Sequence, residues 1–277
     1  MAAKWEKLLI LCKTYPSPSG KYAETSCVAA INEQKQFVRL YPIPFRLIRK
    51  QDQFKKWQWA RIQINKAKKD HRPESHTVNV DAISCDPEAI STKNNWKDRR
   101  AAIEGACQFT SFDDLEEFRA KHNTSLAFLK PRRIIELLII PVQNPNWTDL
   151  ELNKLLRRKD QSDLFDSGDE TEIKLLRKLP YDFYYRYICD VNGEEKEYKH
   201  KIVDWEVGAL YWNCVQKHKE HWEKPFRDQM VTFMSSRDLI FFMGNMHQYQ
   251  WQWLIISLIY PPKDLPIPTT GDLFGSF

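Results

Sequence analysis

Short apolar runs separated by polar turns dominate the first third of the chain. The run at residues 7–12, KLLILC, is apolar after its first lysine and predicts a buried strand. Two further runs, 27–31 and 36–41, flank the polar sequence Asn-Glu-Gln-Lys, which predicts a β-hairpin with a short turn. Residues 57–65 alternate between apolar and polar, as expected of a half-exposed strand, and 77–83 predict another.

Helical and strand patterns mix in the rest of the chain. Helices are predicted over 45–56, 112–122, 149–159, 205–218 and 222–234. Strands are predicted over 126–129, 134–141, 181–189, 197–203, 238–243 and 251–260, with Asn192-Gly193 as a hairpin turn. We therefore predict the α+β class: mainly antiparallel β-hairpins with interspersed helices. Neither G-x-G-x-x-G nor a P-loop is present, which argues against a nucleotide-driven enzyme.

The best candidate for a domain boundary is the segment 159–171. It is polar, acidic and contains a glycine, a composition typical of loops and linkers. We predict a basic, β-rich N-terminal domain over 1–158 and an α+β C-terminal domain over 172–277.

Composition and the lengths of the apolar runs indicate the cellular compartment that is expected for this protein. No apolar run approaches the roughly 20 residues of a membrane span, so no membrane partner is expected. The N-terminus lacks a signal-peptide pattern, and six cysteines are scattered without C-x-x-C pairs. These features favour a cytoplasmic protein with reduced thiols.

Charge is distributed unevenly along the chain. Residues 1–110 carry 20 Lys and Arg against 11 Asp and Glu, whereas residues 111–277 carry 22 against 26. The span 35–72 alone holds 12 basic residues and two acids, interleaved with aromatic residues. Cations neutralise phosphates, and exposed aromatic rings stack on unpaired bases, so the pattern is that of a nucleic-acid-binding surface.

Ten residues of this span are the predicted nucleic-acid-binding residues. On the alternating strand, Trp57, Trp59 and Arg61 are expected to share one face. The full set is Arg39, Arg46, Arg49, Lys50, Lys55, Lys56, Trp57, Trp59, Arg61 and Arg72. The alternative is a solvated basic face with the tryptophans buried beneath it.

Three other clusters hold residues of types that can bind metals or anions or take part in catalysis. The segment 70–76, DHRPESH, is interpreted as a surface turn, with an anion-contacting loop and then a metal-binding or proton-transferring site as the alternatives. Cys214, His218 and His221 have a spacing that places them on one helix face, but no second half-site supports a zinc site. Carboxylates between Asp182 and Glu206 include two E-x-K patterns, as a two-metal nuclease would need. We assign no metal ligand, catalytic residue or cofactor from them.

Several motifs are similar to those of a family of uncharacterised bacterial proteins. They are RLYPIPFR at 39–46, RPES at 72–75, DWE at 204–206 and the ending FFMGN followed by WLIISLIYPP. The resemblance would cover most of the chain. It implies no activity, fold or site, and no functional residue is carried over from it.

Three functions follow from these observations, in decreasing order of support. The first is nucleic-acid binding, DNA or RNA, through the basic N-terminal surface. The second is a metal-dependent nuclease acting on the same class of partner. The third is a protein–protein adaptor that uses the acidic segment or the proline-rich tail.

Overall fold

The computed structural model describes residues 3–156 and 175–263. Its first sheet is formed by residues 4–89. The strands are β1 (Lys4–Lys13), β2 (Ser17–Ser19), β3 (Ala23–Asn32), β4 (Phe37–Ile43), β5 (Gln58–Lys66) and β6 (Ser75–Ala89). Strand β1 pairs with both β3 and β5, and β6 joins β5 to β4, so five of the six strands close into a barrel. Only the pair β4–β6 is parallel in this barrel.

Every second side chain along the strands points into the barrel and fills it. In β5, Ala60, Ile62 and Ile64 are fully buried inside, whereas Arg61 between them faces solvent. Side chains from β1, β3 and β4, among them Ile10 and Leu40, complete the same core. The predicted strand at 57–65 is confirmed from Gln58 onward.

The second sheet has seven strands. They are β7 (Gln108–Phe109), β8 (Leu126–Leu129), β9 (Arg133–Pro141), β10 (Tyr181–Val191), β11 (Glu194–Ile202), β12 (Ile240–Asn245) and β13 (Trp253–Ile259). Their order in the sheet is β7-β8-β12-β13-β11-β10-β9. The turn between β10 and β11 has positive φ at both Asn192 and Gly193, as the Asn-Gly signal predicts.

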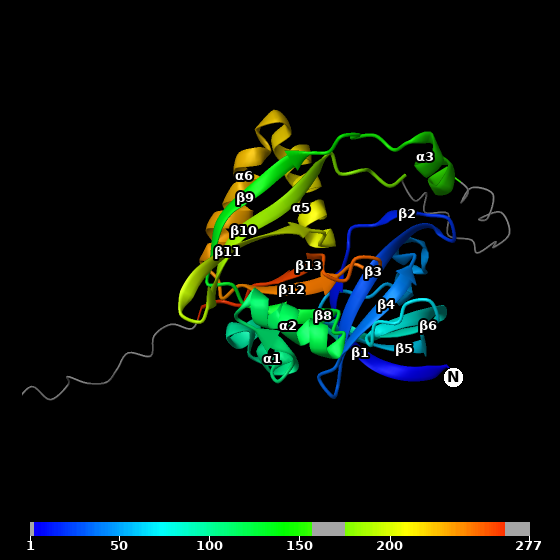
Figure 1. Ribbon diagram of the computed structural model, residues 1–277. Helices are drawn as coiled ribbons and strands as arrows, with labels where there is room; N and C mark the ends of the chain where they lie inside the picture. Colours follow the sequence, from blue (N-terminus) through cyan, green and yellow to red (C-terminus); the bar gives the residue numbers. More distant parts are fainter. Residues whose placement is uncertain (1–2, 157–174, 264–277) are drawn as a thin grey trace, which may run out of the picture.

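Helices lie between and beside the sheets (Figure 1). They are α1 (Lys93–Ile103), α2 (Phe112–His122), α3 (Asp149–Leu156), α5 (Trp205–His218) and α6 (Glu223–Arg227), with 3-10 turns at Phe45–Leu47, Lys50–Asp52 and Lys219–His221 and a π-helical turn at Asp228–Phe233. Side chains cap two of the helix starts: Ser111 accepts from the Asp114 amide at 3.3 Å, and Asp204 accepts from the Glu206 amide at 2.8 Å.

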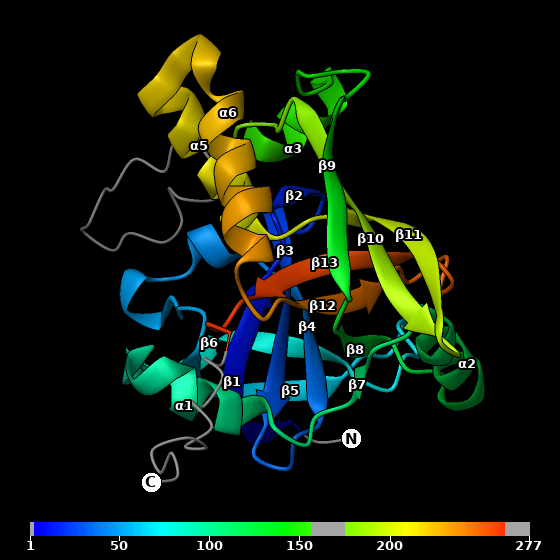
Figure 2. The same cartoon turned by 90° about the vertical axis from the view of Figure 1, so that its left-hand side faces the viewer.

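The second sheet is the middle layer of the molecule (Figure 2). On one face, Phe128, Phe242 and Ile256 pack against Phe37 and other residues on the outside of the barrel. On the opposite face, residues next to these in the same strands pack against α5 and α6. Phe241, for example, lies in one core with Tyr211 of α5 and Phe226 of α6. Because the central strands β8, β12 and β13 bury both of their faces, the two sheets form one continuous structure.

This architecture corrects one expectation. The fold is α+β, but its sheets are mixed: β7–β8 and β11–β13 are parallel as well as β4–β6, and the barrel is more than a set of hairpins. The last strand of the barrel ends at residue 89 and the first strand of the second sheet begins at residue 108. Strand β8 pairs with β12 and β9 pairs with β10, so both belong to the second sheet. The segment 159–171, predicted as the boundary, lies outside the described residues.

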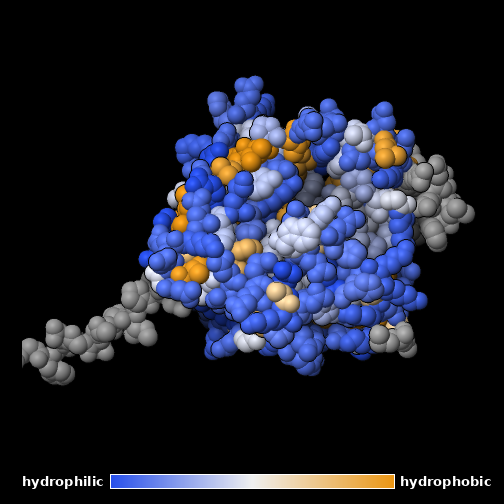
Figure 3. All heavy atoms as spheres, viewed as in Figure 1, coloured by the Kyte–Doolittle hydropathy of each residue, from blue (hydrophilic) through white to orange (hydrophobic). Residues whose placement is uncertain are grey.

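No helix in the described part of the chain is long and apolar enough to cross a membrane. The face of the molecule in Figure 3 is largely hydrophilic over the barrel, while apolar side chains gather along β9.

Candidate nucleic-acid interface

Burial separates the ten predicted nucleic-acid-binding residues into different groups. Arg39, Trp57 and Arg72 are buried, at 4%, 2% and 5% exposure. Trp57 has a φ of 67° and precedes β5, so it does not share the outward face of Trp59 and Arg61. The exposed members are Arg49, Lys50, Lys55 and Arg61, and the half-buried ones are Arg46, Lys56 and Trp59.

The exposed members come from two places, the connection between β4 and β5, which holds Arg49, Lys50 and Lys55, and strand β5, which holds Arg61. Lys50 and Lys55 belong to the connection between β4 and β5, near the Lys13 end of β1. At the opposite end of β1, Lys4 pairs with Ile64, shortly before the connection between β5 and β6. A strand of this length spans about 30 Å, so Lys50 and Lys55 lie far from the connection between β5 and β6 at the other end of β1.

Two of the buried or half-buried cations join the barrel to the second sheet. The Arg39 guanidinium donates to the backbone carbonyl of Ser125 at 2.8 Å. Lys56 Nζ donates to the Glu206 carboxylate at 2.8 Å and to the Leu258 carbonyl at 2.9 Å. These cations are already engaged by Ser125 directly before β8, by Glu206 on α5 and by Leu258 in β13.

Lys56 belongs to a buried ionisable cluster at the same junction. Burial raises the pKa of Asp204, which lies 3.9 Å from Lys56 Nζ. Lys13 Nζ lies 3.7 Å from the centre of the Phe45 ring, and burial lowers its pKa to about 8. The sequence gives no indication of this cluster, because its members come from distant segments.

A different cationic segment is exposed at the end of the barrel where β1 begins. We call residues 66–72, between β5 and β6, the basic loop. Within it Lys68, Lys69 and His71 are exposed, and no ion pair engages Lys68 or Lys69 among the described residues. The loop therefore offers two lysines that are available to a ligand.

The basic loop has a defined conformation. Arg72 lies 2.6 Å from the Asp70 carboxylate, and Ser75 donates to the same carboxylate at 2.8 Å. Burial alone would raise the pKa of Asp70, but the hydrogen bonds from Arg72 and Ser75 outweigh it and hold that pKa well below its ordinary value. The carboxylate thus stays charged and fixes the turn that carries the lysines.

A second exposed loop touches the basic loop. Arg72 Nη1 donates to the Asn245 carbonyl at 2.6 Å, and His247 Nε2 lies 3.8 Å from Asp70. We call residues 246–252, between β12 and β13, the aromatic loop, because it exposes Tyr249 and Trp251. The sequence predicted a strand over 251–260, whereas β13 begins at Trp253 and Trp251 lies in the turn before it. The only sequence signal of this loop is the alternation of aromatic and glutamine residues in HQYQWQ.

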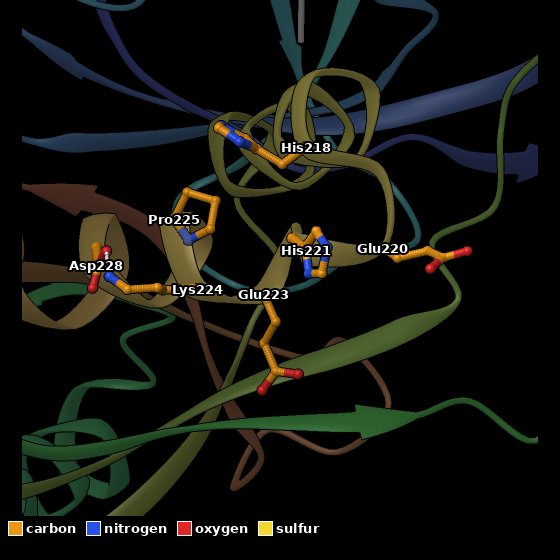
Figure 4. Close-up of a pocket in the computed structure, with 7 residues that line it drawn as sticks. All are labelled: His218, Glu220, His221, Glu223, Lys224, Pro225 and Asp228. Atoms are coloured by element: carbon orange, nitrogen blue, oxygen red, sulfur yellow. Dashed lines mark hydrogen bonds and ion pairs between the residues drawn. The ribbon is translucent and has the colours of Figure 1, made fainter.

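The structure does not bring together Cys214, His218 and His221, the three residues whose spacing was considered for a zinc site. Cys214 is buried in the core on α5, while His218 and His221 line a shallow cavity of about 630 Å³ at the turn between α5 and α6. In Figure 4 the labelled side chains around this cavity spread outward, and Lys224 is paired with Asp228 at 2.7 Å. Over the described ranges, no three His, Cys, Asp or Glu side chains gather as a metal site requires.

The acidic set from Asp182 to Glu206 is distributed over surface ion pairs. Three of these carboxylates pair with arginines: Asp190 with Arg132 at 2.7 Å, Glu195 with Arg133 at 2.9 Å, and Glu197 with Arg186 at 2.6 Å. Asp204 is buried as the cap of α5 and accepts from the Leu258 amide at 3.0 Å. The geometry assigns these carboxylates structural partners and brings no three of them together within the described residues.

Two family models divide the chain at the same place as its sheets. The model described as Domain of unknown function (DUF8757) matches residues 108–276, which is more than half of the chain. The chain belongs to the DUF8757 family. A second model, Domain of unknown function (DUF8758), matches residues 4–105. None of the curated proteins compared with the chain matches it.

The basic loop lies in the DUF8758 region and the aromatic loop in the DUF8757 region. The family membership confirms the resemblance to an uncharacterised family; its bacterial origin stays a prediction. The contact from Arg72 to Asn245 therefore joins loops from two regions that are matched by separate family models.

Proposed function

We propose that the chain binds nucleic acid through the basic loop. The observation that carries the proposal is the pair Lys68 and Lys69, which are exposed on a turn held by the ion pair between Asp70 and Arg72. Fixed, unpaired cations bind phosphates at little cost in ordering, because the loop need not rearrange to present them.

The barrel supports this choice by analogy. In five-stranded Greek-key barrels of the OB-fold type, oligonucleotides bind on the face of the second and third strands and on the loops beside it. Here the second and third strands of the barrel, β3 and β4, are covered on their outer side by the second sheet. The loop between the fourth and fifth barrel strands is the basic loop, and it stays exposed. Architecture alone does not establish function, so the argument rests on the lysines.

A binding titration with two matched double variants tests the proposal. Labelled DNA and RNA are titrated at two salt concentrations and followed by fluorescence anisotropy. Lys68→Gln with Lys69→Gln should weaken binding and reduce the salt slope by about 2, since each phosphate contact contributes about 0.9. Lys50→Gln with Lys55→Gln removes the same charge from the opposite end of the barrel and should leave the slope unchanged.

The two results that oppose the proposal are distinct. A loop variant that binds as well as the unmodified chain removes the basic loop from consideration. If the Lys50 and Lys55 variant weakens instead, the surface lies at the end predicted from the sequence. The nuclease and adaptor alternatives remain predictions, and both segments named for the adaptor lie largely outside the described residues.

A further inference from the structure

The aromatic loop presents its two rings in an arrangement that leaves one of them open. Trp251 is 62% exposed and Tyr249 45% exposed. Their ring centres lie 5.5 Å apart at an interplanar angle of 68°, so the rings meet edge to face. An edge-to-face pair covers only part of each ring, and the indole of Trp251 retains most of its surface for a ligand.

The backbone of the aromatic loop is tied down at both ends. The Met246 amide donates to the Gln252 carbonyl at 3.0 Å, and the Gln252 amide donates to the Tyr249 carbonyl at 2.8 Å. Asn245, directly before the loop, is 3% exposed and accepts from Arg72. These bonds hold the rings outward, so little conformational entropy is lost when a ligand packs on them.

Exposed aromatic rings and cations are brought together here from different regions of the chain. His247 lies against Asp70, whose sequence neighbours Lys69 and His71 are exposed. A ligand that touches both loops therefore needs a flat aromatic group and a negative charge within a short distance. A nucleotide has both, and in a single strand its base face is available.

Resting on the proposed function, we infer that the aromatic loop makes this site selective for single-stranded over duplex nucleic acid, with Trp251 stacking on an unpaired base. In a duplex both faces of each base are covered by neighbouring base pairs, so the indole has no face to stack on. The basic loop contacts phosphates in either form, because a backbone is present in both. Selectivity thus comes from the aromatic loop and charge-dependent affinity from the basic loop.

The test compares strands of one sequence on the full-length chain. A labelled 12-nucleotide single strand, as DNA and as RNA, and the matching duplexes are titrated by anisotropy at one salt concentration. Trp251→Ala should weaken single-strand binding by about five-fold to 150-fold, the range given by the loss of one stacked base, and should leave duplex binding unchanged. Trp5→Ala, which removes a tryptophan 50% exposed on β1, is the matched control and should change neither.

The outcomes separate the inference from the proposed function. If the unmodified chain binds single strands and duplexes equally, or if Trp251→Ala weakens both to the same degree, the selectivity is wrong while binding through the basic loop stands. If the Lys68 and Lys69 variant retains full affinity but Trp251→Ala loses it, the stacking holds and the electrostatic surface is misplaced. Absence of binding to every strand at low salt overturns both.

Discussion

Arg72 Nη1 lies 2.6 Å from the backbone carbonyl of Asn245, 173 residues further along the chain, while its Nη2 lies 2.6 Å from Asp70. A single guanidinium thus fixes the turn of the basic loop and the start of the aromatic loop. Because only 6% of the Arg72 side chain is exposed, both interactions are shielded from water.

Removing this guanidinium should destabilise the fold. Arg72→Leu leaves the Asp70 carboxylate without its partner, and we expect a loss of about 3 kcal/mol in the free energy of unfolding. Arg49→Leu is the control, because Arg49 also lies 2.6 Å from an aspartate but is 65% exposed, so its loss should cost less than about 1 kcal/mol. Urea unfolding at pH 7 measures both. Equal losses would show that the burial of Arg72 adds nothing to the contribution of its ion pair to the free energy of unfolding.

Lys13 should make stability depend on alkaline pH. Burial lowers its pKa to about 8 in the fold, so between pH 8 and about 10.5 the unfolded chain binds the extra proton and stability rises with pH. Lys13→Met removes this cation from its place beside the Phe45 ring. We expect the variant to gain about 3 kcal/mol relative to the unmodified chain at pH 7 and to lose that gain by pH 10.5. A gain that is the same at both values would contradict a lowered pKa.

His200 should make the stability of the fold depend on pH in the acidic range. Burial lowers its pKa to about 4, and its Nδ1 lies 2.8 Å from the Tyr187 hydroxyl. The unfolded chain therefore binds the extra proton between about pH 6.5 and 4, and stability falls as pH falls through that window. In His200→Gln, the difference in stability between pH 7 and pH 4 should shrink by about 3 kcal/mol. Thermal unfolding at the two pH values decides, and an unchanged difference would assign the acid sensitivity to other groups.

Local signals in the sequence were sufficient for most of the elements. Ser111 and Asp204 are side chains that satisfy free amides at helix starts, and Asn192-Gly193 accepts the positive φ of a tight turn. Each of these effects acts within three residues, so a single sequence reveals it. The parallel pairings and the closure of the barrel depend on distant partners, and no local pattern encodes them.

The candidate site was harder to predict for the same reason. Arg39 and Lys56 look like surface cations in the sequence, but their partners Ser125 and Glu206 lie 86 and 150 residues away. Charge density along the sequence therefore predicts a basic region, but it cannot distinguish the cations that join the two sheets from those that stay exposed. Trp251 was not among the predicted residues, because the aromatic loop meets the basic loop only in the folded chain, through Asn245 and His247.

Gly208 on α5 marks where the barrel docks against that helix. A Cβ at this position would lie 2.7 Å from Cε2 of Tyr15, closer than real contacts allow. The Tyr15 ring cannot swing away freely, because its hydroxyl donates to the Arg177 carbonyl at 2.8 Å and accepts from Trp212 at 2.9 Å. Alanine normally stabilises a helix by about 1 kcal/mol relative to glycine, so here two effects compete.

We expect the clash to outweigh the helical preference. Gly208→Ala should lower the free energy of unfolding by about 1–2 kcal/mol, since overpacking at a rigid contact costs about 1–3 kcal/mol. Gly20→Ala serves as the control, because no atom lies within 4 Å of its added Cβ and its φ is not in the left-handed region. The double variant Gly208→Ala with Tyr15→Leu should recover part of the loss, since it removes the ring that obstructs the methyl group. Stabilisation by Gly208→Ala alone would mean that α5 and Tyr15 move apart easily and that the docking of the barrel is soft at this point.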